Sequence, residues 1–118
     1  MSPPAVRPSP ATLASVAPLF TALGDQTRLY LVSRLCQEGP LSITRLAEGT
    51  TLTRQAVAKH LRVLGDAGLA TSGRQGREQQ WRIEARRLAE VRRLLGRISS
   101  QWDGALARLA AVVERDRR

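Results

Sequence analysis

The architecture of this chain follows from residues 52–69, which read Leu52-Thr-Arg-Gln-Ala-Val-Ala-Lys-His-Leu-Arg-Val-Leu-Gly-Asp-Ala-Gly-Leu69. Thr53 is a typical helix N-cap, because its hydroxyl can accept a hydrogen bond from a free backbone amide. At about 100° per residue, the apolar side chains of this segment fall on one face. That face consists of Val57, Leu61 and Leu64. The pattern predicts a helix over residues 54–67 that packs into a core.

A second, shorter helix is predicted immediately upstream. Ser42 is a good N-cap for a helix over residues 43–48, and residues 49–52 form a short connection to the helix that follows. Two short helices joined by about four residues are typical of a helix-turn-helix.

Two further helices are predicted before this pair, over residues 11–23 and from the N-cap Asp25 to about residue 37. Apolar residues recur in both at a spacing of three or four. In the first helix this spacing is carried by Leu13, Val16, Phe20 and Leu23. We expect the inner face of the second helix to hold Leu29, Val32, Leu35 and Cys36. Residues 1–10 contain four prolines and are expected to form a flexible arm.

Downstream, a β-hairpin and a long helix are predicted. Residues 69–72 and 77–83 flank a glycine-bounded turn at residues 73–76, and alternation in the second run points Trp81 and Ile83 inward. A hairpin directly after a helix-turn-helix forms a wing. Residues 85–114 then carry a narrow apolar stripe, which is typical of a helix that packs against a partner helix.

The predicted fold class is mainly α (α+β): a winged helix-turn-helix with about five helices and a two-stranded β-hairpin wing. Residues 11–118 form one domain, whose first and last helices are expected to dimerise. The expected dimer interface consists of Leu13, Val16, Phe20, Leu95, Ile98, Trp102, Leu106 and Leu109.

The charge indicates a polyanionic partner. The 118 residues carry a formal net charge of +9, and Lys59 is the only lysine among the 19 basic residues. A small basic domain most often binds nucleic acid. Arginine enrichment in a GC-rich genome, or binding to acidic lipids, would also account for this charge. Aromatic residues make up only 3% of the chain, which argues against a protein that stacks single-stranded bases.

The expected DNA-binding residues lie on the helix over residues 54–67 and on the wing. Gln55, Lys59 and Arg62 share the face opposite the apolar one; glutamine can pair with adenine, and lysine or arginine can read guanine. Amides at the start of that helix favour a phosphate, and arginines near the hairpin tip suit phosphate or the minor groove. Alternatively, all of these side chains are simply solvated. The expected set is Thr53, Arg54, Gln55, Lys59, His60, Arg62, Arg74 and Arg77.

Several kinds of site are not expected. No catalytic constellation is recognisable, so the chain is not predicted to be an enzyme, and no cofactor is expected. Cys36 is the only cysteine and His60 the only histidine, which excludes an intramolecular disulfide and an intrachain metal centre built from cysteines or several histidines. Cys36 is expected to be buried. No membrane span or signal peptide is evident, so we expect a cytoplasmic protein without a membrane partner.

Three motifs, spread over residues 13–83 in order and spacing, resemble the ArsR/SmtB family of bacterial winged-helix repressors. These are Phe20-Thr-Ala-Leu-Gly-Asp-Gln-Thr-Arg-Leu-Tyr-Leu-Val, the segment quoted at the start, and Gly73-Arg-Gln-Gly-Arg-Glu-Gln-Gln-Trp-Arg-Ile. The resemblance implies a homodimer that binds an imperfect palindrome near a promoter and represses transcription. It also implies a dimer interface built from the first and last helices.

The chain departs from the metal-sensing members of that family. They carry Cys-x-Cys in the helix-turn-helix, or His and Asp ligands on the last helix, whereas residues 43–48 lack cysteine and the last helix lacks histidine. Persulfide-sensing members need two cysteines. The tail around Trp102, Ser-Gln-Trp-Asp-Gly-Ala-Leu, resembles a metal-free subgroup, some members of which act as autorepressors.

The predicted function is therefore sequence-specific binding of double-stranded DNA by a homodimeric repressor, through residues 53–67 and the wing at residues 69–83. Two alternatives remain open: a winged-helix protein-interaction module and a thiol-responsive regulator that uses Cys36. An unidentified small-molecule or protein effector is also left open.

Overall fold

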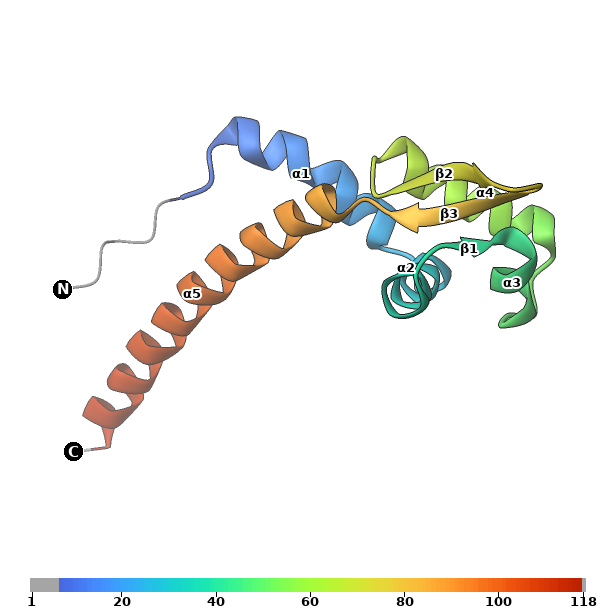
Figure 1. Ribbon diagram of the computed structural model, residues 1–118. Coiled ribbons are helices and arrows are strands. Elements are labelled where there is room, and N and C mark those ends of the chain that lie inside the picture. The colour runs from blue at the N-terminus through green and yellow to red at the C-terminus, as the bar shows by residue number, and fades with distance from the viewer. Residues whose placement is uncertain (1–6, 118) are drawn as a thin grey trace.

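The computed structural model describes residues 7–117, which form five helices and one three-stranded sheet (Figure 1). The mainly helical winged helix-turn-helix is thus confirmed, with one strand more than expected. The predicted arm lies largely outside the described residues, and its boundary moves because Pro10 is already helical. The elements are α1 (Pro10–Leu23), α2 (Gln26–Glu38), β1 (Leu41–Ser42), α3 (Ile43–Glu48), α4 (Arg54–Asp66), β2 (Ala70–Gln75), β3 (Glu78–Ile83) and α5 (Ala85–Asp116).

Polar N-caps set the starts of the first four helices. Asp25, Ser42 and Thr53 each accept a hydrogen bond from the backbone amide three residues later, at 3.0, 3.2 and 3.1 Å, as their sequence positions predict. Ser9 caps α1 in the same way, through the amide of Thr12 at 3.1 Å. Each cap satisfies an amide that has no partner within the helix.

The wing differs from the prediction in its turn. Gly73 and Arg74 lie within β2, opposite Gln80 and Gln79 of β3, so β2 is longer than predicted and the turn has only two residues. Those residues are Gly76, whose φ is +67°, and Arg77. Glycine at the first turn position of a two-residue hairpin suits a type II′ turn, because it adopts positive φ without steric cost.

The additional strand, β1, ties the helix-turn-helix to the wing. Its residues Leu41 and Ser42 pair with Trp81 and Gln80 of β3, which gives the antiparallel order β1-β3-β2. A two-residue strand is too short to show alternation, so the sequence gives no sign of it.

The core lies between α1, α2, α3, α4 and the root of the wing. Val57, Leu61 and Leu64 of α4 are fully buried, as predicted, and so are Leu19, Leu31, Leu46 and Leu69. The inner face of α2 is centred on Leu31 and Leu35, and this places Leu29 and Cys36 about 120–140° away from it. The expectation that these two residues face inward is therefore wrong: Leu29 is 52% exposed, and Cys36 is also exposed.

The last helix extends far beyond the core. α5 has 32 residues, of which only Val91 and Leu94 are buried, and it makes the molecule 68 Å long but only 30 by 21 Å across (Figure 1). Within residues 7–117, no helix has an apolar stretch long enough to cross a membrane.

The packing of the wing against α4 depends on one close approach. A Cβ at Gly65, in the last turn of α4, would lie 3.3 Å from the ring of Trp81 and 3.6 Å from the carbonyl oxygen of Ala70. Trp81 is itself buried, so its ring fills the space that the glycine leaves. The absence of a side chain at position 65 thus lets β2 and β3 pack directly against the end of α4.

We predict that Gly65→Val lowers the free energy of unfolding by about 1–3 kcal/mol, because an inserted side chain must displace the Trp81 ring or the backbone of Ala70. Urea unfolding at one fixed protein concentration measures the effect. Gly96→Ala is the control, because its added methyl group would have no described atom within 4 Å apart from its chain neighbours and the nearby backbone of α5 itself. That control should raise the free energy of unfolding by about 0.5–1 kcal/mol through helix propensity. Unchanged stability in Gly65→Val would contradict the packing argument.

Candidate nucleic-acid interface

The outward face of α4 is polar and cationic. Gln55, Lys59 and Arg62 are all exposed on the side opposite the buried leucines. Thr53 and Arg54 are also exposed at the start of the helix, where the Thr53 hydroxyl caps the amide of Ala56. The structure thus brings together five of the eight residues that the sequence analysis selected, on one accessible surface.

The wing supplies the remaining exposed cations. Arg74 lies near the end of β2 and Arg77 in the turn, and both are exposed. Arg74 also lines a shallow groove of about 350 Å³ together with Arg82. Arg82 was not among the residues predicted from the sequence, although alternation with Trp81 places it on the outer side of β3. Its Nε lies 3.3 Å from the Thr71 hydroxyl oxygen, which holds the side chain against β2.

His60 differs from the other selected residues because its ring contacts α2. The side chain is 26% exposed, and its Nδ1 lies 3.3 Å from Nη1 of Arg28 and 3.8 Å from Oδ2 of Asp25. The Arg28 guanidinium also donates to the carbonyl oxygen of Ala22, at the end of α1. His60 therefore connects α4 to the junction of α1 and α2.

The charge state of Asp25 is coupled to the same contacts. A hydrogen bond from the backbone amide of Arg28 lowers the pKa of the Asp25 carboxyl below its usual value, and the positive charge of the Arg28 guanidinium acts in the same direction. The carboxylate that caps α2 is thus held ionised next to α4.

A second set of polar contacts holds α3 in place. Nη1 of Arg34 donates to the carbonyl oxygens of Arg45 and Leu46, at 3.0 and 3.3 Å. The Tyr30 hydroxyl donates to the carbonyl oxygen of Gly49 at 3.0 Å. These carbonyls lie at the end of α3 and have no partner within that helix, so α2 caps α3 from the side. Sequence periodicity gives no sign of these contacts, because they join residues 11–19 positions apart.

An ion pair orients the Arg34 guanidinium. Its Nε donates to Oε2 of Glu38 at 2.7 Å, one helical turn along α2. The shared hydrogen bond lowers the pKa of the Glu38 carboxyl and raises the pKa of Arg34. The Arg34 side chain is only 15% exposed, which limits its other conformations.

The predicted dimer-interface residues separate into two groups. Most of the stripe on α5 is uncovered, with exposed fractions between 43% and 65% for Leu95, Ile98, Trp102, Leu106 and Leu109. We call these five residues the apolar stripe. Leu13 of α1 is exposed as well, and Phe20 packs partly against the core. Val16 differs from the others: it is 3% exposed and packs in the core of the single chain, so its place in the dimer interface stays a prediction.

Other chemistry is not evident in the part of the chain that the structure describes. Among residues 7–117, no group of three or more His, Cys, Asp or Glu side chains gathers in a way that could hold a metal ion.

Comparison with known proteins shows to which family the chain belongs. The family model described as "Bacterial regulatory protein, arsR family" matches residues 25–72. The helix-turn-helix (HTH) type transcriptional regulator Rv2034 of Mycobacterium tuberculosis is 34% identical over 95 residues, which are 80% of this chain and 85% of that protein. The chain belongs to the ArsR family. It is thus a relative of transcriptional regulators and not of enzymes.

Solved structures of ArsR-family proteins share the fold over most of the chain. An ArsR-like transcriptional regulator from Rhodococcus sp. RHA1 has a TM-score of 0.73 and 36% identity, and the match covers 91% of this chain and 97% of that chain. A homodimeric winged helix-turn-helix DNA-binding domain from Mycobacterium bovis, described as a possible ArsR-family regulator, has a TM-score of 0.62 and 25% identity. That match covers 81% of this chain and 91% of the other.

We predict that Arg34→Gln lowers the free energy of unfolding by about 1–3 kcal/mol, because the carbonyls at the end of α3 lose a charged donor. Urea unfolding measures the change. Arg45→Gln is the control: its pair with Glu48 is 4.0 Å long and both side chains are more than 60% exposed, so the change should stay within about 0.5 kcal/mol. Equal effects of the two variants would show that Arg34 does not stabilise α3.

Proposed function

We propose that this ArsR-family protein is a homodimeric transcriptional repressor that binds a palindromic operator, with α4 in the major groove and the wing on the flanking backbone. One observation carries the proposal: Gln55, Lys59 and Arg62 form an exposed polar and cationic face beside the exposed arginines of the wing. A helix that bound a protein partner through this face would be expected to expose apolar residues instead.

The proposed contacts divide into base readers and phosphate contacts. Gln55 and Lys59 lie in the first half of α4, where a recognition helix reaches base edges, so we assign them to base reading. We assign Thr53 and Arg54 to a phosphate at the helix start, where amides and the helix dipole favour an anion. We assign Arg62 to either a base edge or a phosphate. His60 contributes mainly by holding α4 against α2.

The wing arginines would raise the affinity for DNA of any sequence and contribute little to discrimination between sequences. Arg74 and Arg77 are assigned to phosphate or the adjacent minor groove, and Arg82 lines the same groove as Arg74. Each cation that neutralises a phosphate releases counterions, so binding should weaken steeply with salt. The net charge of +9 supports this part of the proposal.

The homodimer is supported by the exposed apolar stripe of α5 and by the homodimeric relative from Mycobacterium bovis. A two-fold dimer would present two copies of α4 to half-sites that are one helical turn, or a multiple of it, apart. We further assign the protein to the metal-free subgroup, because Cys36 is the only cysteine and His60 the only histidine. The proposed DNA partner implies a cytoplasmic location.

The proposal is tested by fluorescence anisotropy on DNA from upstream of the gene and on a shuffled copy, at several salt concentrations. We expect a preference of about a thousandfold or more for the native fragment and a steep fall of both affinities with salt. Equal affinities would contradict sequence-specific recognition of that fragment. No binding near 0.1 M salt would overturn the DNA-binding role and favour a protein-interaction module.

Two variants separate base reading from phosphate contact in the same assay. Gln55→Ala should narrow the gap between native and shuffled DNA, because a base contact is lost, by roughly 1–3 kcal/mol. Arg77→Ala should weaken binding to both fragments about equally and reduce the salt dependence. Arg108→Ala, on the exposed distal part of α5, is the charge-matched control and should change neither. Unaltered discrimination in Gln55→Ala would remove Gln55 from the base-reading set.

The dimer is tested through the apolar stripe. Leu106→Glu should shift the protein towards monomer in sedimentation velocity, because it places a charge in the proposed apolar interface. Leu29→Glu is the matched control, since Leu29 is equally apolar and similarly exposed but lies on α2. A Leu106→Glu protein that sediments like the unmodified protein would exclude this stripe as the dimer interface.

A further inference from the structure

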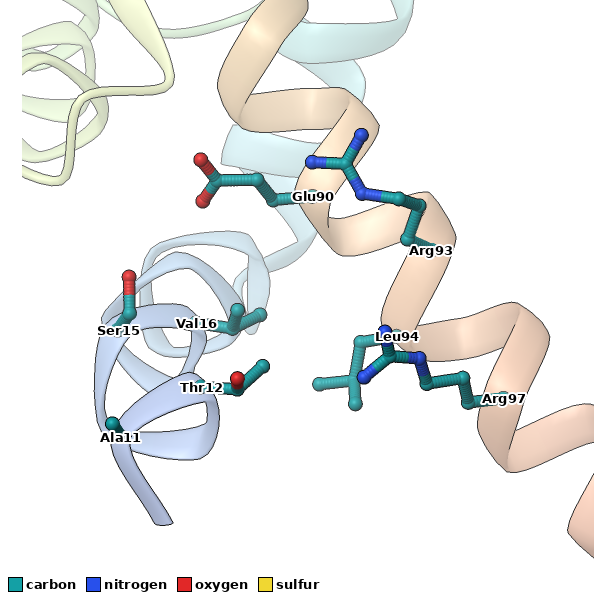
Figure 2. A pocket seen from close by; sticks show the side chains of 8 residues that line it. All are labelled: Ala11, Thr12, Ser15, Val16, Glu90, Arg93, Leu94 and Arg97. Atoms are coloured by element: carbon teal, nitrogen blue, oxygen red, sulfur yellow. The ribbon is translucent and has the colours of Figure 1, made fainter. Parts of the chain in front are cut away.

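A cleft of about 430 Å³ separates α1 from the first part of α5 (Figure 2). Val16 of α1 and Leu94 of α5 are buried and form its apolar floor. The hydroxyl-bearing residues Thr12 and Ser15 line it from α1, while Arg93 and Arg97 line it from α5. In Figure 2, the side chains of Thr12 and Leu94 extend into the space between the two helices. The volume is within the range of small-molecule sites.

The cleft has an excess of positive charge. Neither Arg93 nor Arg97 forms an ion pair with any residue between 7 and 117, the range that the structure describes. Of the described residues that line the cleft, Glu90 is the one carboxylate, and its Oε2 accepts a hydrogen bond from Arg87 at 2.6 Å. Glu90 is thus paired with Arg87, and the guanidinium groups of Arg93 and Arg97 have no carboxylate partner among the described residues.

We propose that this cleft binds a small amphipathic anion, that is, an oxyanion carried on an apolar group. The oxyanion would pair with Arg93 and Arg97, because a guanidinium presents parallel N–H donors that match two oxygens. The hydroxyl of Ser15 would supply a further donor from the opposite wall, whereas that of Thr12 already hydrogen-bonds to the Ser9 hydroxyl at 2.9 Å. The apolar group would lie on Val16 and Leu94, at the floor of the cleft.

The proposed ligand and the proposed dimer use different faces of α5. At about 100° per residue, Arg93 and Arg97 point about 140–180° away from the mean direction of the apolar stripe. On α1, Leu13 likewise lies about 100–160° from Thr12 and Ser15. A second copy seated on the stripe therefore leaves the cleft open, so the dimer and the ligand can coexist. Any effect of the ligand on DNA affinity rests on the proposed function, whereas binding at the cleft does not.

Isothermal titration calorimetry of the full chain with decanoate tests the proposal without DNA. We expect one site per chain that saturates below about 5 mM decanoate. Two control ligands should bind at least about tenfold more weakly. Decanol has the same chain length without the charge, and acetate has the charge without the chain. Equal binding of decanol would show a purely apolar site and overturn the proposal. So would the absence of any decanoate binding.

Matched variants place the site. Arg93→Gln with Arg97→Gln should weaken decanoate at least about tenfold. Arg86→Gln with Arg108→Gln removes the same charge from exposed positions of α5 outside the cleft and should leave the affinity within about twofold. Circular dichroism checks that both proteins remain helical. Equal losses in the two double variants would show a non-specific effect of charge and overturn the assignment.

Methyl NMR distinguishes the cleft from the apolar stripe. Decanoate should shift the methyl signals of Val16 and Leu94 and leave those of Leu106 and Leu109 unchanged. Shifts confined to Leu106 and Leu109 would place decanoate on the stripe and overturn the proposal. Sedimentation at saturating decanoate should show an unchanged mass, because the two faces are separate. Dissociation of a dimer by decanoate would contradict that separation.

Discussion

The relation between α4 and the wing, the two elements that we propose to face DNA, depends on the packing of the Trp81 ring against the backbone at Gly65. The recognition surface on α4 and the cations of the wing are only useful together if their separation is constant. β3 holds Trp81 in the sheet through its pairing with both Leu41 and Ser72, and the ring then contacts the last turn of α4. One aromatic side chain thus fixes the wing, the helix-turn-helix and α4 relative to one another. Among the described residues its Nε1 has no hydrogen-bond partner, which indicates that packing of the ring, rather than its polar group, determines this position.

Polar contacts from α2 complete the frame that the core begins. At the start of α2, Asp25 and Arg28 contact His60 of α4; further along the helix, Tyr30 and Arg34 contact carbonyl oxygens at the end of α3. A helix of only six residues has little stability of its own, so α3 needs such outside partners. Leucine side chains fill the core, and these directional hydrogen bonds orient α3 and α4 relative to α2.

Local chemistry was predictable from the sequence, and long-range contacts were not. Asp25, Ser42 and Thr53 were identified as caps because a cap and its amide lie three residues apart. The buried face of α4 was identified because its apolar residues recur at helical spacing, which is also local information. The turn of the wing was misplaced because two glycines compete for it, and only strand pairing shows that Gly76 has the positive φ. Cys36 and Leu29 were assigned inward because apolar character alone does not show which side of α2 the other helices cover. The caps from Arg34 and Tyr30 join distant positions, which periodicity cannot reveal. The exposed cations of α4 and the wing were found from spacing, but their contacts with DNA remain predictions.

The long last helix has a mechanical consequence. From Leu95 to the end of α5, the helix spans about 33 Å at 1.5 Å per residue, and in the single chain this part has no buried residue to hold it. It therefore acts as a lever arm whose fulcrum is the buried pair Val91 and Leu94. A tilt of about 10° at the fulcrum displaces the far end by roughly 6 Å, a distance comparable to one helical turn. Small angular changes at the root of α5 are in this way amplified into large translations at its tip, and in a symmetric assembly the same geometry converts them into changes of spacing between the two winged-helix bodies.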